Sequence, residues 1–205
     1  MTIHCGDVRE ILPRLEAESV HCVVTSPPYW GLRDYGCEGQ LGLESTPDLY
    51  IANMVGVFRE VKRVLRADGT LWLNMGDSYA SNGTGGNGAT GGRDKSTLQS
   101  AMPPIGTTPV ERHIPAGLKA KDLCGIPWLL AFALRADGWY LRQDIIWSKP
   151  NPMPESVTDR CTKAHEYIFL LSKSERYYYN AEAVMEPYAR LWDASKPNGS
   201  TGRDG

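Results

Sequence analysis

The chain has 205 residues, of which 41% are hydrophobic and 22% charged, and its formal net charge is −2. This composition is typical of one globular domain with a core and excludes a long disordered chain. No apolar run approaches the roughly 20 residues of a membrane span, and the N-terminus lacks a signal-peptide pattern, so we expect a cytoplasmic protein. The 5 cysteines are scattered without a Cys-x-x-Cys pair, which predicts neither a zinc site nor a disulfide framework.

The first elements alternate between strand and helix. Residues 1–5 predict a short strand, and Asp7 then caps an amphipathic helix of two turns. Val20–Val24 predicts a second strand. We expect Cys5 and Cys22, which lie in these two strands, to be small core residues.

A long helix is predicted next. Pro47 stands at a first helical position after Thr46 as a possible cap, and the apolar stripe that follows is expected to stop at Gly69. Thr70–Met75 predicts a strand that is apolar on both faces and therefore central. Residues 80–117 are rich in glycine and proline and predict a long mobile loop, a candidate insert for target recognition.

The C-terminal part resumes the alternation. Trp128–Leu134 predicts a helix, Trp139–Trp147 and Tyr167–Leu171 predict strands, and residues 177–179 suggest an edge strand. This spacing predicts an α/β fold with a parallel sheet. The string Leu-Arg-Ala-Asp-Gly occurs at 65–69 and again at 134–138, which we interpret as two helix ends with a left-handed glycine.

The most informative segment follows the second strand, where Thr25 leads into Ser26, Pro27, Pro28 and Tyr29. The two prolines fix the backbone and remove two N–H donors, so hydrogen-bond acceptors dominate this strand end. They are the Ser26 hydroxyl and the carbonyl groups of Ser26 and Pro27, with the Tyr29 ring beside them. Acceptors next to a stacking ring suit a planar base that carries an amino group. A disordered proline-rich ligand is the alternative, but it would have polar flanks.

This Ser-Pro-Pro-Tyr segment resembles that of the DNA amino-methyltransferases, which move a methyl group from S-adenosylmethionine (AdoMet) to an exocyclic base nitrogen. The resemblance implies that Ser26, Pro27, Pro28 and Tyr29 form the catalytic segment, with Tyr29 stacked on a flipped base. In that family the serine form accompanies N4-cytosine most often, and an aspartate form accompanies N6-adenine, so both bases stay open and cytosine leads. Methylation of cytosine carbon-5 needs a Pro-Cys pair, which this chain lacks.

Motif order indicates the class within that family. Only 24 residues precede Thr25, which leaves no room for an AdoMet-binding strand and its glycine turn upstream. The chain therefore resembles the beta class, a Rossmann-like AdoMet-dependent sheet in permuted order with the catalytic loop first. The turn before Asp7 resembles that class's Gly-Asp turn, which implies that Asp7 contacts the adenine of AdoMet. A simple helix cap at Asp7 is the alternative.

Two further segments resemble the class, Trp147 to Asn151 and His165 to Phe169. We expect Lys149 and Asn151, at a strand end, to contact the flipped nucleotide, and we place Trp30 with them as a substrate-binding residue. The histidines have no metal spacing, so no metal site is predicted.

No Phe-x-Gly-x-Gly motif follows these segments. We therefore expect residues 1–188 to form an incomplete catalytic domain, residues 189–205 to be a disordered tail, and the sheet to have an exposed edge. The expected partner is double-stranded DNA with a flipped target base, in a restriction–modification setting with a cognate restriction enzyme. An inactive DNA-binding remnant remains an alternative, as does an RNA or protein methyltransferase with an Asn-Pro-Pro-Tyr loop.

Overall fold

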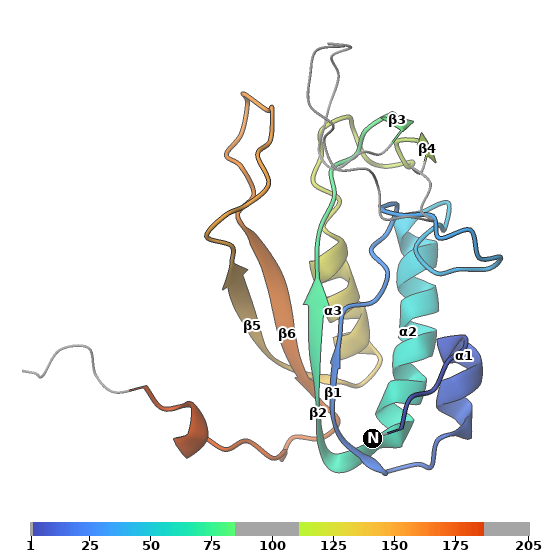
Figure 1. Ribbon diagram of the computed structural model, residues 1–205, viewed down its shortest axis with the longest axis vertical. Coiled ribbons are helices and arrows are strands. Elements are labelled where there is room, and N and C mark those ends of the chain that lie inside the picture. Colours follow the sequence, from blue (N-terminus) through green and yellow to red (C-terminus); the bar gives the residue numbers. More distant parts are fainter. Residues whose placement is uncertain (1, 85–110, 187–205) are drawn as a thin grey trace, which may run out of the picture.

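The computed structural model describes residues 2–84 and 111–186 (Figure 1). The expectations for residues 85–110, within the predicted loop, and for the tail at 189–205 lie outside these ranges. The predicted domain boundary at residue 188 also lies outside these ranges and stays a prediction. The helices are α1 (Val8–Ile11), η1 (Leu12–Arg14), α2 (Pro47–Val64), α3 (Ile126–Ala136) and η2 (Glu182–Val184). The strands are β1 (Val20–Thr25), β2 (Leu65–Met75), β3 (Gly83–Thr84), β4 (Glu111–Arg112), β5 (Tyr140–Ser148) and β6 (His165–Ser172).

The main sheet has the strand order β1-β2-β6-β5. β1 and β2 run parallel, whereas β2 with β6 and β6 with β5 run antiparallel. The α/β class is thus confirmed, but the expectation of a parallel sheet holds for one pair alone. The reason is that β6 returns directly from β5 through a loop, and such a return without a helix gives antiparallel neighbours.

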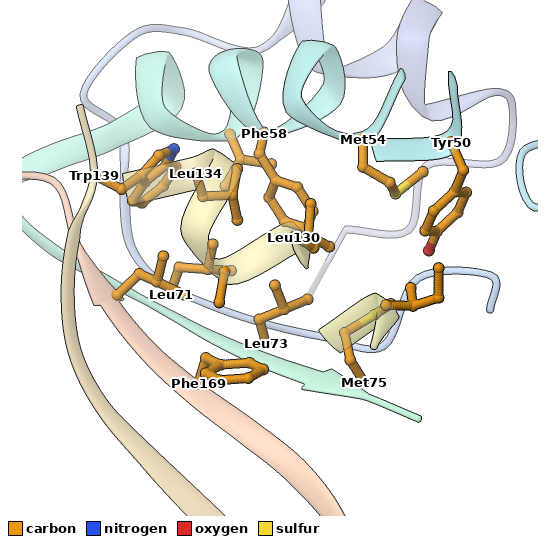
Figure 2. Packing of buried hydrophobic residues seen from close by; sticks show 14 of the residues in the cluster. Tyr50, Met54, Phe58, Leu71, Leu73, Met75, Leu130, Leu134, Trp139 and Phe169 are labelled. Atoms are coloured by element: carbon orange, nitrogen blue, oxygen red, sulfur yellow. The ribbon is translucent and has the colours of Figure 1, made fainter. Parts of the chain in front are cut away.

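α2 and α3 cover one face of the sheet, and the hydrophobic core lies between these helices and the sheet (Figure 2). The apolar stripe of α2 buries Tyr50, Met54 and Phe58, and β2 opposes it with Leu71 and Leu73. The cap of α2 is as predicted, because the Thr46 side chain accepts a hydrogen bond from the Leu49 N–H and Pro47 opens the helix. β2 is central, also as predicted. No helix of the described ranges is long and apolar enough to cross a bilayer.

β1 is an edge strand within the described part of the chain, as expected. Its alternate residues point away from the helices, so Val24 is 79% exposed. Cys22 shares that outer face and is exposed, which makes its assignment to the core wrong. Residues 2–5 form no strand and Cys5 is exposed, since no neighbouring strand is present to pair with this segment among the described residues.

The two Leu-Arg-Ala-Asp-Gly strings adopt different structures, contrary to the prediction. α2 ends at Val64, and residues 65–69 already belong to β2. A Cβ at Gly69 would lie 2.9 Å from Leu65 Cδ2 and 3.2 Å from the His21 carbonyl oxygen, so this glycine permits close strand approach. Gly138 does follow its helix with φ +93°, the left-handed form. Residues 177–179 form no strand, and the backbone N–H of Tyr178 instead donates to the Asp68 carbonyl.

Candidate active site

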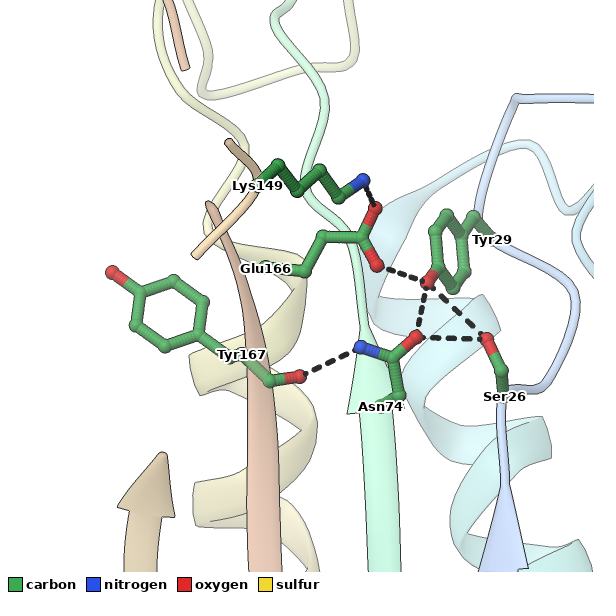
Figure 3. A network of polar contacts seen from close by, with 6 residues as sticks. All are labelled: Ser26, Tyr29, Asn74, Lys149, Glu166 and Tyr167. Atoms are coloured by element: carbon green, nitrogen blue, oxygen red, sulfur yellow. Dashed lines mark hydrogen bonds and ion pairs between the residues drawn. The ribbon is translucent and has the colours of Figure 1, made fainter. Parts of the chain in front are cut away.

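The end of β1 lies beside the end of β2, and this register places Ser26 next to Asn74. The Ser26 hydroxyl lies 3.3 Å from Asn74 Oδ1 and 3.2 Å from the Tyr29 hydroxyl, which itself lies 2.9 Å from Asn74 Oδ1 (Figure 3). The Asn74 amide is oriented by its own bond, since its Nδ2 donates to the Tyr167 carbonyl at 3.2 Å. Ser26 is exposed, whereas Tyr29 and Asn74 are half-buried. The serine is therefore the member of this cluster that is most open to a ligand.

A carboxylate from β6 completes the cluster. The Tyr29 hydroxyl lies 3.1 Å from Glu166 Oε2, and the other carboxylate oxygen of Glu166 accepts a hydrogen bond from the Lys149 ammonium group (Figure 3). Burial alone would raise the pKa of Glu166, but the bond and charge of Lys149 outweigh it and hold that pKa below its ordinary value. Burial raises the pKa of Tyr29, and the Glu166 charge adds to that rise. Glu166 is consequently an anion facing a neutral phenol.

The protons of this cluster can be assigned from its acceptors. A carboxylate is the strongest acceptor near the Tyr29 hydroxyl, so that proton goes to Glu166. The single proton of Ser26 is then donated inward, to Asn74 Oδ1 or to the Tyr29 oxygen. Both arrangements leave lone pairs of the Ser26 oxygen free for an outside donor.

The Tyr29 ring lies directly on the backbone that follows β2. A Cβ at Gly76 would come within 2.5 Å of Tyr29 Cε2, a distance that no side chain tolerates. The segment is also tied to α2, because the Tyr50 hydroxyl donates to the Pro28 carbonyl at 2.8 Å. Burial raises the pKa of Tyr50, which keeps this donor protonated. The Ser-Pro-Pro-Tyr segment is thus held by the core below it and the strand beside it.

Of the other residues predicted from the sequence, Pro27 and Lys149 lie at the cluster, whereas the side chains of Trp30 and Asn151 make no hydrogen bond with it among the described residues. The carbonyl of Pro27 receives no hydrogen bond from any residue of the described ranges, so it keeps both lone pairs for a ligand. Lys149 joins the cluster through Glu166, as described above. Trp30 instead turns inward, where its indole N–H donates to the Glu44 carbonyl at 2.9 Å. Asn151 is exposed beyond the end of β5, and no contact of its side chain to the cluster is seen among the described residues.

Asp7 caps α1 and pairs with Arg9. One carboxylate oxygen accepts the Arg9 backbone N–H at 2.8 Å, and the guanidinium group binds both oxygens. These hydrogen bonds lower the pKa of Asp7 to about 2. The cap alternative from the sequence is confirmed, and the adenine contact stays a prediction. Gly6, immediately before it, has φ +152°, a backbone angle that favours glycine.

Asp77 binds a helix end at the border of this site. Its carboxylate accepts the backbone N–H groups of Ser78 at 2.9 Å, and of Gly125 and Ile126 at 3.1 Å each, where α3 begins. Gly125 has no side chain to cap the helix itself, so Asp77 replaces that cap from across the fold. Burial raises the pKa of Asp77 above its ordinary value despite these bonds and the nearby charge of Lys163.

Sequence reasoning missed two members of the cluster, Asn74 and Glu166. Both lie in segments that were recognised, but neither was given a role. Asn74 is a polar residue that directly follows the apolar run of residues 71–73 in β2, and that was the available signal. Glu166 gives no such signal, because 137 residues separate it from Tyr29.

A family model described as DNA methylase matches residues 20–202. The chain belongs to this family. The match begins with β1 and therefore includes the Ser26 segment and both strands that supply Asn74 and Glu166. The family recognised from the Ser-Pro-Pro-Tyr segment is thereby confirmed.

Several curated relatives are type II methyltransferases. M.Cfr9I of Citrobacter freundii is 55% identical over 185 residues, which is 90% of this chain and 58% of that protein. M.SmaI of Serratia marcescens is 55% identical over 182 residues, which is 89% of this chain and 59% of that protein. M.SfiI of Streptomyces fimbriatus is 43% identical over 91% of this chain and 39% of its own length. The chain thus spans less than two thirds of the length of these relatives.

Solved structures show the same fold. The PvuII DNA methyltransferase, described as cytosine-N4-specific, aligns with a TM-score of 0.58 at 18% identity, over 88% of this chain and 51% of its own. A DNA modification methylase from Thermus thermophilus, solved with S-adenosyl-L-methionine, aligns with a TM-score of 0.53 at 23% identity, over 88% of this chain and 56% of its own. The fold is therefore that of the DNA methyltransferases, as the sequence predicted.

Proposed function

We propose that the chain is the catalytic portion of a DNA methyltransferase that moves a methyl group from AdoMet to the exocyclic N4 of cytosine. One observation carries this proposal, namely that the Ser26 hydroxyl lies 3.2 Å from the Tyr29 hydroxyl and 3.3 Å from Asn74 Oδ1. With its proton assigned inward, Ser26 presents lone pairs beside the Pro27 carbonyl, which has no partner among the described residues. Two acceptors on a rigid strand end match the two N–H bonds of an exocyclic amine.

The chemistry required of these residues is polarisation. The lone pair of the cytosine amine is delocalised into the ring, which makes this nitrogen a poor nucleophile. Hydrogen bonds from its two N–H groups to the Ser26 oxygen and the Pro27 carbonyl draw the nitrogen toward tetrahedral geometry and localise that pair. As the N–C bond forms, the bond between the methyl carbon and the sulfonium sulfur would break, leaving a neutral thioether and a positively charged nitrogen. One of the N–H groups then loses its proton to water or to a nearby acceptor. A neutral serine suffices, since no proton has to leave before the attack.

Tyr29 has two parts to play in this proposal. Its ring would stack on the flipped base, a contact worth about 1–3 kcal/mol that helps to offset the unstacking of the duplex. Its hydroxyl is fixed by Glu166 and Lys149, so the ring cannot rotate away from the acceptors. Glu166 is in this view a positioning residue rather than a base.

Bound AdoMet would supply the electrophilic methyl carbon of its sulfonium group. The chain offers Asp7 as one contact to it. The low pKa of Asp7 keeps this exposed carboxylate ionised as an acceptor for an adenine amino group, and the adjacent Gly6 leaves room for close approach. Arg9 occupies the same carboxylate, however, so Asp7 would have to share its oxygens. The remaining contacts are expected from sequence that the relatives have and this chain does not span.

The choice of cytosine rests on Ser26. In the family that this segment resembles, an aspartate at this position accompanies N6-adenine. The PvuII enzyme, described as cytosine-N4-specific, has the same fold and agrees with this choice. Double-stranded DNA with a flipped cytosine is the proposed substrate. The type II names of the relatives further suggest a partner restriction enzyme of the same sequence specificity.

The direct test is to incubate the protein with AdoMet and unmethylated DNA, digest the DNA and measure its nucleosides by mass spectrometry. N4-methylcytosine in the sample, formed about 10²-fold more slowly with Ser26→Ala, is the expected result. N6-methyladenine in place of it would overturn the choice of base and keep the reaction class.

A product-free sample from folded protein needs a second measurement, a calorimetric titration with AdoMet and separately with duplex DNA. DNA binding without AdoMet binding would identify the inactive remnant that the sequence left open. Loss of both would contradict the proposed function itself.

A further inference from the structure

A loop held by several hydrogen bonds connects the catalytic segment to α2. Residues 30–44 leave the site at Trp30 and return beside it, and the base of the loop is closed by the Gly31 N–H, which donates to the Gly42 carbonyl at 2.7 Å. Gly42 has φ +99°, and a Cβ there would lie 3.1 Å from the Tyr29 carbonyl oxygen. The base of the loop therefore packs directly on the catalytic segment (Figure 1).

One side chain, Gln40, bridges the backbone at the tip of this loop. Gln40 donates from Nε2 to the Arg33 carbonyl at 2.9 Å and accepts at Oε1 the Tyr35 N–H at 2.7 Å. The carboxylate of Asp34 is used within the turn, where it accepts the Gly36 N–H at 2.7 Å. From outside the loop, Arg9 donates to the Gly39 carbonyl at 2.9 Å. The backbone on either side of Arg33 is consequently fixed without any helix or strand.

The side chain that this scaffold displays is an exposed arginine. Arg33 is exposed, and its guanidinium group has no hydrogen bond, ion pair or ring contact to any residue that the structure describes. Several other described cations are engaged by carboxylates: Arg9 by Asp7, Lys121 by Asp159, Lys149 by Glu166 and Arg160 by Glu155. Lys163 forms no ion pair with a described residue and lies over the Tyr167 ring. Since the whole chain has a net charge of −2, an exposed arginine beside the site that has no carboxylate partner among the described residues adds a local positive field.

We propose that Arg33 binds a backbone phosphate next to the flipped nucleotide, with Gln40 holding the loop in the binding conformation. This inference rests on the proposed function. Four peptide units separate Tyr29 from Arg33, so the two Cα atoms lie within roughly 14 Å of each other even if the chain is fully extended. Phosphates flanking a base that is held at Ser26 and Tyr29 fall within the reach of an arginine side chain at that distance. A guanidinium group can bind two phosphate oxygens at once, and a phosphate contact carries no base preference, which fits a contact that orients the duplex.

A salt titration isolates this contact. The probe is a fluorescein-labelled DNA duplex with one cytosine opposite an abasic position, and binding is followed by fluorescence anisotropy at several NaCl concentrations. Each phosphate contact contributes about 0.9 to the slope of log K against log salt. We expect Arg33→Gln to reduce the size of that slope by about 0.9 and Arg33→Lys to retain it. The matched control is Arg176→Gln, which removes another exposed arginine without a partner among the described residues, at the opposite end of the sheet next to the 65–69 segment.

The outcomes separate the two proposals. A slope reduced by Arg33→Gln and unchanged by Arg176→Gln supports the phosphate contact. Equal slopes for the two variants, with the unchanged protein binding DNA, overturn the role of Arg33 and leave the proposed function standing. No binding by the unchanged protein at low salt overturns the proposed function, and the contact with it.

Discussion

The Tyr29 hydroxyl lies 3.1 Å from Glu166 Oε2, although 137 residues separate the two in the chain. The contact joins the segment after β1 to the start of β6, and these two strands lie on the two sides of β2. It explains how an exposed loop tip can hold a tyrosine in one orientation, because the carboxylate is itself fixed by Lys149.

Replacing Glu166 by Gln should lower the pKa of Tyr29. Burial is the main reason that this pKa is raised and will persist, but the Glu166 charge also raises it and will be lost. An NMR titration of ring-labelled tyrosine, assigned with Tyr29→Phe, measures the shift. The control is Glu155→Gln, which removes the partner of Arg160 and should leave the Tyr29 titration unchanged. Identical Tyr29 curves for both variants would show that Glu166 does not act on the phenol.

Gly76→Ala should inactivate the enzyme while leaving it folded. The new Cβ would overlap Tyr29 Cε2 at 2.5 Å, so the ring must leave its place, and such overpacking costs about 1–3 kcal/mol. Gly56→Ala is the matched control, because nothing lies within 4 Å of a Cβ at that exposed position of α2. It should stabilise the protein by about 0.5–1 kcal/mol. Urea unfolding and nucleoside analysis of both variants check the pair. Wild-type methylation by Gly76→Ala would contradict the importance of the ring position.

Asp77→Ala should destabilise the protein by about 0.5–2 kcal/mol, the usual loss for a helix cap. The pH dependence has a definite sign. Because burial raises the folded pKa of Asp77 above its unfolded value, the contribution of this titration to stability is full below the unfolded pKa and is lost as the pH rises through the folded pKa. Across that window the urea midpoint of the unchanged protein, taken relative to that of the variant, should therefore fall as the pH rises. Parallel curves would contradict the raised pKa.

Ser26→Ala should lower turnover by about 10²-fold, in line with the loss of one positioned polar group at a reacting centre. DNA binding should be nearly unchanged, since the phosphates and the stacked base are held by other residues. Tyr29→Ala should weaken both turnover and binding. Single-turnover methylation and anisotropy measurements on the two variants distinguish these effects. A wild-type rate for Ser26→Ala would remove serine from the proposed chemistry.

Local patterns predicted the parts of the fold that depend on neighbours in sequence. Thr46 and Pro47 marked the start of α2, and the apolar run Val20–Val24 marked β1, because caps and strand propensity act over a few residues. The end of α2 was misplaced, since the same five letters that close α3 lie in a strand at 65–69. The first copy pairs with β1 and packs Gly69 against His21, and such packing is tertiary.

The site was predictable to the same extent. Ser26 and Tyr29 were singled out because a rigid proline turn at a strand end is a local signal, and their catalytic roles stay predictions. The role of Glu166 was not, because it depends on β6 lying beside β2, and the sequence favoured parallel pairing. The outward direction of Cys22 likewise depends on which face of the sheet the helices cover.

The strand order also determines when the site can form during folding. β1 and β2 can pair as soon as α2 has closed the short connection between them, and this brings Ser26 to Asn74. β6 must close a much longer loop onto β2 before Glu166 reaches Tyr29, and the entropy of loop closure grows with that length. The acceptors would therefore assemble early and the carboxylate that fixes the ring would arrive last, so a folding intermediate that lacks the β5–β6 hairpin would carry the serine without an ordered tyrosine.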